Sequence, residues 1–184
     1  MVDVDAFALH NAFEMNHPEA MEGMVALVNI GHDVTNINIL EEGVPILTRD
    51  LTVGTRRYTE DLQRDRGVSG DEATALIMGN DRSPHLDAVN ETRGEEVAVG
   101  VERAVAFLAS NIKGGAAVRA LYTCGGGARI PGLTEQLGTR LRIESQKANP
   151  LSVLAMAEGA MEGLSVDDVA TLLMLPIGLA LRET

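Results

Sequence analysis

The sequence predicts an α/β protein in which a mixed sheet is flanked by helices. Three apolar stretches on tight turns follow one another in the first third of the chain, a pattern typical of an antiparallel meander. In the last third, another apolar stretch runs straight into three glycines and then into a helix-like segment. Between these regions apolar residues recur at helical spacing, so strands and helices are expected to alternate along the chain.

The first three strands are expected at residues 24–30, 34–40 and 44–53. The first is apolar on both faces apart from Asn29, which suits a strand buried between two helical layers. The turns that join the three strands are tight, so this part of the sheet should be antiparallel. Pro45 cannot donate a hydrogen bond to a neighbouring strand, so it indicates an edge position or the entry to the strand.

The middle of the chain is expected to be mainly helical. A first helix is predicted over residues 58–66, and Ser69 to Glu72 has the form of a capping box that opens a second. A long helix carries apolar residues at helical spacing from 97 to 112 and is expected to end near Lys113, where two glycines follow. Residues 81–90 are the most loop-like stretch.

The final third returns to alternating strands and helices. The predicted elements are a strand at 118–123, the glycine loop, a helix at 133–141, a short strand near 142–145, a helix at 151–161, a helix capped at Ser165 and a last helix at 175–182. Pro176 fits the start of that last helix because its missing N–H is not needed there.

Composition narrows the range of functions. The chain has 184 residues, is 45% hydrophobic, carries a formal net charge of -12 and is only 3% aromatic with no tryptophan. The negative charge and the scarcity of aromatic rings argue against binding of nucleic acid. The single cysteine cannot form an internal disulfide, so an intracellular setting is expected. No apolar run is long enough for insertion into a membrane, and the four histidines lack the spacing of metal ligands.

The most informative motif is the run from Tyr122 to Leu133, in which a strand enters three glycines and a Pro-Gly pair opens a helix. Glycines let the backbone lie flush against a flat ligand, and amides at a helix start can bind an anion. The motif lacks the last glycine of the dinucleotide fingerprint, where Ile130 stands, and the Gly-Lys-Ser/Thr of a P-loop. Taken alone, a glycine triplet is more often a simple tight turn.

Together with a second glycine turn, this motif resembles the actin-like ATPases. Residues 28–38 resemble their second phosphate loop, residues 122–133 their adenosine motif, and residues 176–182 their second connecting helix. The resemblance extends to the PilM family of type IV pilus assembly proteins, through residues 4–14, the turn at 42–45 and Thr48-Arg49-Asp50. FtsA-like cell-division proteins are relatives with a different role.

The resemblance implies the second lobe of an actin-like molecule, with a ribonuclease H-like fold. The expected parts are connecting helices at 1–19 and 175–184, subdomain 2A at 20–56 and 116–174, and an inserted subdomain 2B at 57–115. The family's first phosphate loop and its partner-docking domain belong to the other half of the molecule, which we expect to be missing from this chain.

The resemblance also implies which residues face a nucleotide. On the phosphate side they are Asn29, Gly31, Thr35 and Asn36, and on the adenosine side Gly125, Gly126, Gly127, Ala128, Pro131 and Gly132. ATP and Mg²⁺ are the implied ligands of the full-length protein. No catalytic residue and no metal site are expected within this chain.

Three departures from the family pattern argue against an active ATPase. Asn29 stands where the family carries an aspartate that helps to hold magnesium or water, and hard cations favour carboxylate oxygens. Thr74 and Ile77 stand where the family's Glu-x-x-Lys contacts ribose and adenine. The chain also supplies no first phosphate loop. We therefore expect a degenerate ATPase that binds ATP weakly or structurally, and binding by this chain alone is doubtful.

Three functions are compatible with these residues. The resemblance favours a cytoplasmic scaffold, peripheral to the bacterial inner membrane, that grips the membrane protein PilN mainly through the other half and links it to the pilus motor ATPases. The alternatives are an FtsA-like cell-division ATPase and a working ATPase or kinase of the same fold. The acidic residues between Asp61 and Glu96 predict either a solvated face or a docking surface for a basic partner.

Overall fold

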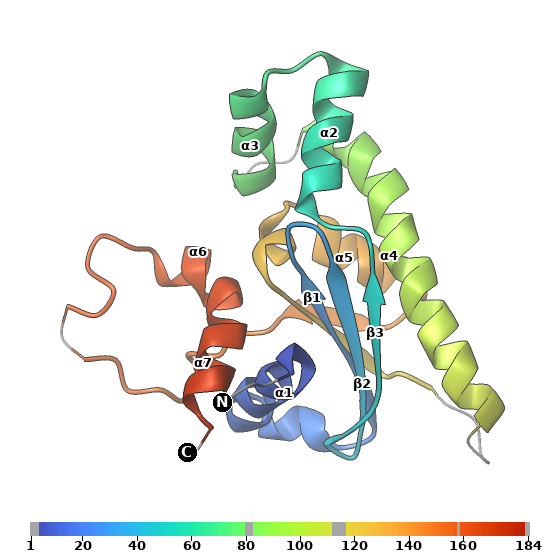
Figure 1. Ribbon diagram of the computed structural model, residues 1–184, viewed down its shortest axis with the longest axis vertical. Helices are drawn as coiled ribbons and strands as arrows, with labels where there is room; N and C mark the ends of the chain where they lie inside the picture. Colours follow the sequence, from blue (N-terminus) through green and yellow to red (C-terminus); the bar gives the residue numbers. More distant parts are fainter. Residues whose placement is uncertain (1–3, 80–82, 112–116, 158, 183–184) are drawn as a thin grey trace.

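In the computed structural model, a five-stranded sheet in the order β3-β2-β1-β4-β5 lies between helices (Figure 1). The structure describes residues 4–79, 83–111, 117–157 and 159–182. The strands are β1 (Met24–Ile30), β2 (Thr35–Glu41), β3 (Val44–Leu51), β4 (Ala120–Cys124) and β5 (Glu144–Lys147). The helical elements are α1 (Asp5–Asn16), η1 (Pro18–Met21), α2 (Thr55–Arg66), α3 (Gly70–Met78), α4 (Pro84–Asn111), η2 (Gly126–Arg129), α5 (Leu133–Leu141), α6 (Val166–Val169), η3 (Ala170–Leu173) and α7 (Met174–Ala180).

The strand pairing confirms the mixed sheet. β1 pairs with β2, and β2 with β3, in antiparallel register, so the meander forms as the tight turns predict. β4 pairs with the other side of β1 in parallel, and β5 adds to β4 in parallel. Pro45 lies on β3, an edge strand, as expected for a residue that cannot donate to a strand on both sides.

The two faces of the sheet contact different helices, because successive side chains of a strand point to opposite sides. On one face, Ala26, Val28 and Ile30 of β1 share a core with α2, α3, α4 and α5. On the other face, Val25 and Leu27 pack with α1 and with Met174 of α7. Burial on both faces explains why β1 reads as an almost continuous apolar run.

The helices α2, α3 and α4 are inserted between β3 and β4. The first part of α4 meets α2 beyond the end of the sheet, and its later part lies along the sheet (Figure 1). Asp61 of α2 joins the two helices, since its carboxylate accepts hydrogen bonds from Arg93 of α4 and from Arg64, both at 2.6 Å. The capping box of α3 forms as predicted, with reciprocal bonds between Ser69 and Glu72.

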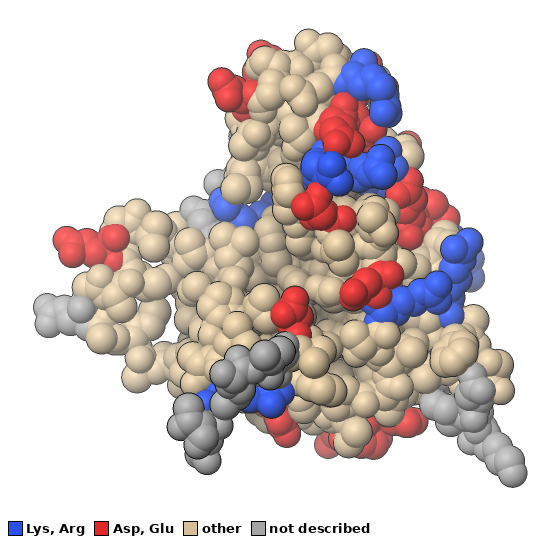
Figure 2. Space-filling view, viewed as in Figure 1, with Lys and Arg blue, Asp and Glu red and all other residues tan. Residues whose placement is uncertain are grey.

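Half of the described acidic residues in this region have basic partners in the structure. The pairs are Asp61 and Glu96 with Arg93, Asp65 with Arg64, and Glu95 with Arg140. Figure 2 shows acidic and basic side chains intermingled around α2 and α4. These pairs favour the interpretation as a solvated face over that of an acidic docking surface, because they neutralise part of the negative charge locally.

The expectation of a loop over residues 81–90 is wrong for its described part. Residues 84–90 form the first two turns of α4. Ser83 accepts a hydrogen bond from the amide of Leu86 (3.1 Å), and Pro84 occupies the first helical position. A serine followed by proline is therefore a helix start here rather than a turn. The glycines expected to end α4, at 114 and 115, lie outside the described residues.

The expectation of a helix over residues 151–161 is also wrong, because the described part of this stretch is irregular. Most of its side chains are exposed, so it has no apolar face to bury, and burial is the main source of helix stability in proteins. Its start is fixed instead by the amide of Val153, which donates to the side chain of Asn16 (3.2 Å). Farther on, Ser165 precedes α6 but its side chain makes no capping bond.

Candidate nucleotide site

The two glycine turns meet at one end of the sheet. β1 and β4 are parallel neighbours with Asn29 opposite Cys124, so the turns that follow both strands leave from the same edge. The expected phosphate-side residues lie on β1, β2 and their hairpin, and the adenosine-side residues follow β4. The structure therefore brings together two candidate sets that are far apart in the sequence.

The hairpin between β1 and β2 is closed by its own hydrogen bonds. The amide of Gly31 donates to the carbonyl of Val34 (3.0 Å), and the hydroxyl of Thr35 donates to the carbonyl of Val53 (2.7 Å). A β-carbon on Gly31 would lie 2.8 Å from the carbonyl oxygen of Val34, so a larger residue does not fit. These two donors therefore shape the hairpin and are already engaged within the chain.

The glycine loop lies flush against the end of β1. Gly125 has a φ of 79°, and a β-carbon there would collide with the side-chain oxygen of Asn29. A β-carbon on Gly127 would collide with the side chain of Ile30. The amide of Gly125 donates to the carbonyl of Thr171 in η3 (2.8 Å), which fixes the start of the loop. Packing within the chain thus requires two of the three glycines, whatever ligand is bound.

A row of polar side chains crosses the sheet below this loop. Asn29, Asn36 and Asp50 lie at one register level on β1, β2 and β3. The side-chain nitrogen of Asn29 donates to the oxygen of Asn36 (3.1 Å), whose nitrogen donates to the carboxylate of Asp50 (2.7 Å). The resemblance pointed to Asn29 and Asn36 as site residues, but not to Asp50, because side-chain partners across a sheet depend on register.

Cys124 completes the row on β4. Its thiol donates weakly to the side-chain oxygen of Asn29, with a sulfur–oxygen distance of 3.7 Å. Burial raises the pKa of the Cys124 thiol far above its ordinary value, so the group stays protonated and is a donor rather than a nucleophile. The cysteine is therefore a structural neighbour of the site.

The adenosine-side residues have distinct roles in the loop. Gly126 is its open position, since a β-carbon there would approach only Leu172, at 3.8 Å. Ala128 is buried. The carbonyl of Pro131 accepts a hydrogen bond from Asn90 of α4 (3.0 Å), and Gly132, with a φ of 79°, leads into α5. Gly126 thus leaves room for a ligand, whereas Pro131 and Gly132 attach the loop to its helices.

At this edge of the sheet, Gly126 leaves an open backbone position where a nucleotide would lie. Asn29 presents a neutral amide oxygen at this edge, and such oxygens are ligands of hard cations, but without the charge of a carboxylate. On α3, Thr74 is exposed and Ile77 is buried in the core, so neither offers a charge to ribose or base. The chain therefore offers shape and polar atoms, but little charge.

The described residues show neither a metal-binding cluster nor a membrane-spanning helix. No three His, Cys, Asp or Glu side chains in this part of the chain gather so that they could hold a metal ion. Within the same ranges, no helix combines the length and apolar character that a bilayer span requires.

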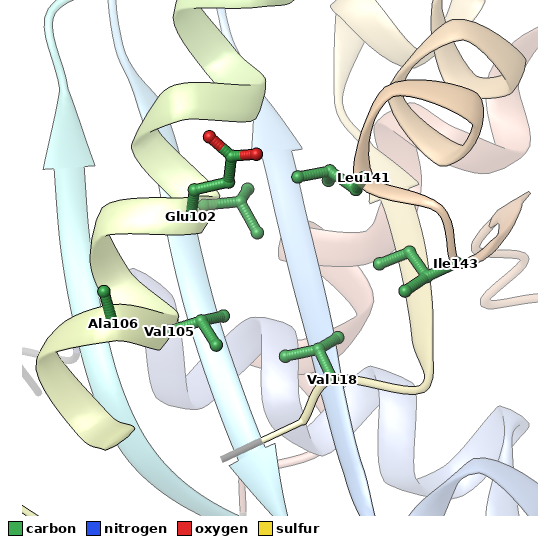
Figure 3. Close-up of a pocket in the computed structure, with 7 residues that line it drawn as sticks. Glu102, Val105, Ala106, Val118, Leu141 and Ile143 are labelled. Atoms are coloured by element: carbon green, nitrogen blue, oxygen red, sulfur yellow. The ribbon is translucent and has the colours of Figure 1, made fainter. Parts of the chain in front are cut away.

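An apolar pocket of about 310 Å³ lies away from the glycine turns, between α4, the segment that leads into β4 and the C-terminal end of α5 (Figure 3). Val105, Val118 and Ile143 point into it, and Glu102 lies at its rim, where it pairs with Arg140 (2.8 Å). A site that orients a ligand usually needs several convergent polar groups. This pocket has mainly aliphatic walls, so we place the candidate site at the glycine turns instead.

Solved structures of similar fold define the class of protein. The chain is similar to a protein of a PilM–PilN type IV pilus biogenesis complex, with a TM-score of 0.81, 23% identity, and coverage of 99% of this chain and 52% of the other. It is also similar to the ethanolamine utilization protein EutJ from Carboxydothermus hydrogenoformans (TM-score 0.67, 21% identity, 97% and 53% covered). A third likeness is to MreB5 of Spiroplasma citri bound to AMPPNP (TM-score 0.66, 12% identity, 100% and 59% covered).

These likenesses confirm the actin-like ATPase fold, with a mixed sheet and flanking helices. The chain spans about half the length of these proteins, in keeping with the prediction of one lobe. The model of the type IV pilus assembly protein PilM family matches residues 1–184, so the chain belongs to that family.

Proposed function

We propose that this chain is the nucleotide-facing portion of a cytoplasmic, actin-like scaffold in type IV pilus assembly. The family match over the whole chain carries the proposal. The similar complex contains PilM and PilN. By extension, the full-length protein binds the inner-membrane protein PilN, mainly through a portion outside this chain. It then links PilN to the pilus motor ATPases while remaining peripheral to the membrane.

In this proposal α1 and α7 belong to the connecting helices at 1–19 and 175–184. Residues 20–56 and 116–174, with the sheet and α5, form subdomain 2A, and residues 57–115, with α2, α3 and α4, form subdomain 2B. An apolar surface beside the connecting helices supports this assignment. Its exposed side chains are Val4, Phe7, Leu172, Leu179 and Leu181. Apolar surfaces of this kind are commonly covered by another domain or chain. We expect the rest of the full-length protein to pack there.

The proposed nucleotide role is binding without rapid hydrolysis. The full-length protein holds ATP with Mg²⁺ weakly or structurally, because Asn29 supplies no charge to the cation. The test is ATP turnover by full-length protein with Mg²⁺, beside the variants Asn29→Asp and Asn29→Ala. Turnover of the unchanged protein on the order of 1 per second or faster would contradict the proposal and favour the working ATPase. Stronger Mg²⁺-dependent ATP binding by Asn29→Asp than by Asn29→Ala is expected.

The proposed partner is tested separately from the nucleotide. Full-length protein should retain a peptide of the PilN cytoplasmic tail in a pull-down and should not retain a tubulin-like division protein. The reverse result would favour the FtsA-like alternative. A peptide of the same composition in scrambled order is the control, because a chain of net charge -12 attracts basic peptides without specificity.

A further inference from the structure

The hydrogen bonds of the polar row that crosses the sheet all run in one direction, and the carboxylate of Asp50 at one end of the row determines that direction. A carboxylate can only accept hydrogen bonds, whereas a carboxamide has a donor end and an acceptor end. Asp50 is exposed on the edge strand β3, and its carboxylate accepts from the nitrogen of Asn36. The acceptor at Asp50 therefore fixes which end of the Asn36 amide points toward it.

The orientation of the Asn36 amide determines in turn the orientation of the Asn29 amide on β1. Because the nitrogen of Asn36 faces Asp50, its oxygen faces β1 and accepts from the nitrogen of Asn29 (3.1 Å). The oxygen of Asn29 must then point away from Asn36, toward β4.

At the far end of the row, the contact with Cys124 agrees with this orientation. The thiol of Cys124 is a donor, and it meets Asn29 at the oxygen. The side-chain oxygen of Asn29 is also the atom that a β-carbon at position 125 would strike. Asn29 thus turns its acceptor end, and not its donor end, toward the glycine loop.

We propose that Asp50 is a positioning residue that acts through Asn36 to aim the amide oxygen of Asn29 at the glycine loop, where it offers a neutral oxygen to a cation that accompanies a bound nucleotide. The cation role rests on the proposed function, whereas the relay itself does not. Reversal of the Asn29 amide would present two N–H donors to that cation and repel it. An exposed residue on an edge strand thereby sets the chemistry of the site two strands away.

The first test follows the relay without any ligand. Full-length protein labelled with ¹⁵N-asparagine gives side-chain amide signals, and the signal missing from Asn29→Asp identifies Asn29. We expect Asp50→Ala and Asn36→Ala to speed hydrogen exchange of the Asn29 amide about five- to tenfold, the loss of about one hydrogen bond. Exposed Asp33, which pairs with Arg56 outside the row, provides the matched control Asp33→Ala, with no change expected. Unchanged exchange in Asp50→Ala would overturn the relay, even if Asn36→Ala, which removes the direct acceptor of Asn29, speeds exchange.

The second test follows the cation. ADP affinity of full-length protein is measured by calorimetry with Mg²⁺ and with EDTA. In Asp50→Ala, the factor by which Mg²⁺ raises the ADP affinity should be about fivefold smaller than in the unchanged protein. The ADP affinity in EDTA should be unchanged. In the Asn29→Asp background Asp50→Ala should have no such effect, because a carboxylate has no donor end.

The two tests separate the two ideas. If the unchanged protein binds no ADP in either condition, the nucleotide part of the proposed function fails and so does the cation role, while the exchange measurement decides the relay. Equal losses with Mg²⁺ and with EDTA would overturn the cation role and leave the relay standing.

Discussion

The helical layers on the two faces of the sheet are held in place by different kinds of contact. On one face, α2, α4 and α5 share a large apolar core and are also joined by ion pairs, a buried one between Asp61 and Arg93 and an exposed one between Glu95 and Arg140. On the other face, α1 and α7 touch at the backbone. A β-carbon on Gly178 of α7 would collide with the carbonyl of Ala8 in α1.

This difference implies a different tolerance of change. Ion pairs at a rim involve side chains that can move, and water or salt can replace part of their energy. Two backbones in contact leave no side chain to give way, so any added volume must separate the helices. The backbone contact should therefore be the more sensitive of the two, and the predictions below test this ranking from the largest effect to the smallest.

Gly178→Leu should cause the largest loss of stability, about 3 kcal/mol or more, because the leucine must push α7 away from α1. Urea unfolding of the full-length protein measures the free energy. Ala75→Leu, at an exposed position of α3 away from the apolar surface beside α1 and α7, is the control and should change stability by no more than about 0.5 kcal/mol. If Gly178→Leu is as stable as this control, the backbone contact does not limit the layer.

Asp61→Asn should have the next largest effect, a loss of about 2 kcal/mol in the free energy of unfolding. The substitution removes the charge of a buried carboxylate that two arginines bind. Asp61 is only 4% exposed, and Arg93 is itself half-buried, so solvent cannot fully replace the pair. The same urea measurement applies, with Asp71→Asn as the control, because Asp71 is an exposed residue of α3. A loss no larger than that of the control would show that the α2–α4 joint does not depend on this charge.

The carboxylate of Asp61 should also contribute to the pH dependence of the free energy of unfolding. Hydrogen bonds from Arg93 hold the pKa of Asp61 below its ordinary value, so the folded state binds fewer protons than the unfolded state. Its contribution is present above about pH 4 and is lost as the pH falls through the lowered pKa. The free energy of unfolding is measured between pH 5 and pH 2, about the range over which carboxyls titrate. It should therefore fall less steeply with decreasing pH for Asp61→Asn than for the unchanged protein. Identical slopes in the two proteins would contradict this assignment.

The sequence predicts most of this fold because its signals are local. β1 is a long apolar run and α5 follows a Pro-Gly pair, and both elements begin and end close to the expected residues. The errors also have local causes. Ser83 and Pro84 serve a helix start as readily as a turn, and the stretch after Leu151 is rich in small residues but finds no surface against which to bury them.

The site is less predictable because its atoms meet across strands. Motif resemblance leads to Asn29 and to the glycines, since these residues lie in recognisable runs. The roles of Asp50 and Cys124 depend on the register of β3 and β4 with β1 and β2, which no local pattern specifies. The glycines are also ambiguous in sequence, because Gly127 is explained by contact with Ile30 even before any ligand is considered.

Arg140→Ala should have the smallest effect and the strongest dependence on salt. Arg140 of α5 bonds Glu95 (2.6 and 2.8 Å) and Glu102 (2.8 Å) of α4, and it holds the pKa of Glu95 below its ordinary value. All three side chains are substantially exposed to water, so their attraction is weak and is screened as the Debye length falls to about 3 Å at 1 M salt. Urea unfolding at low and high NaCl should show a small deficit that disappears with salt, whereas the deficit of Asp61→Asn persists. A deficit for Arg140→Ala that exceeds that of Asp61→Asn, or that survives high salt, would mean that the exposed rim, and not the buried joint, holds α4 and α5 to the sheet.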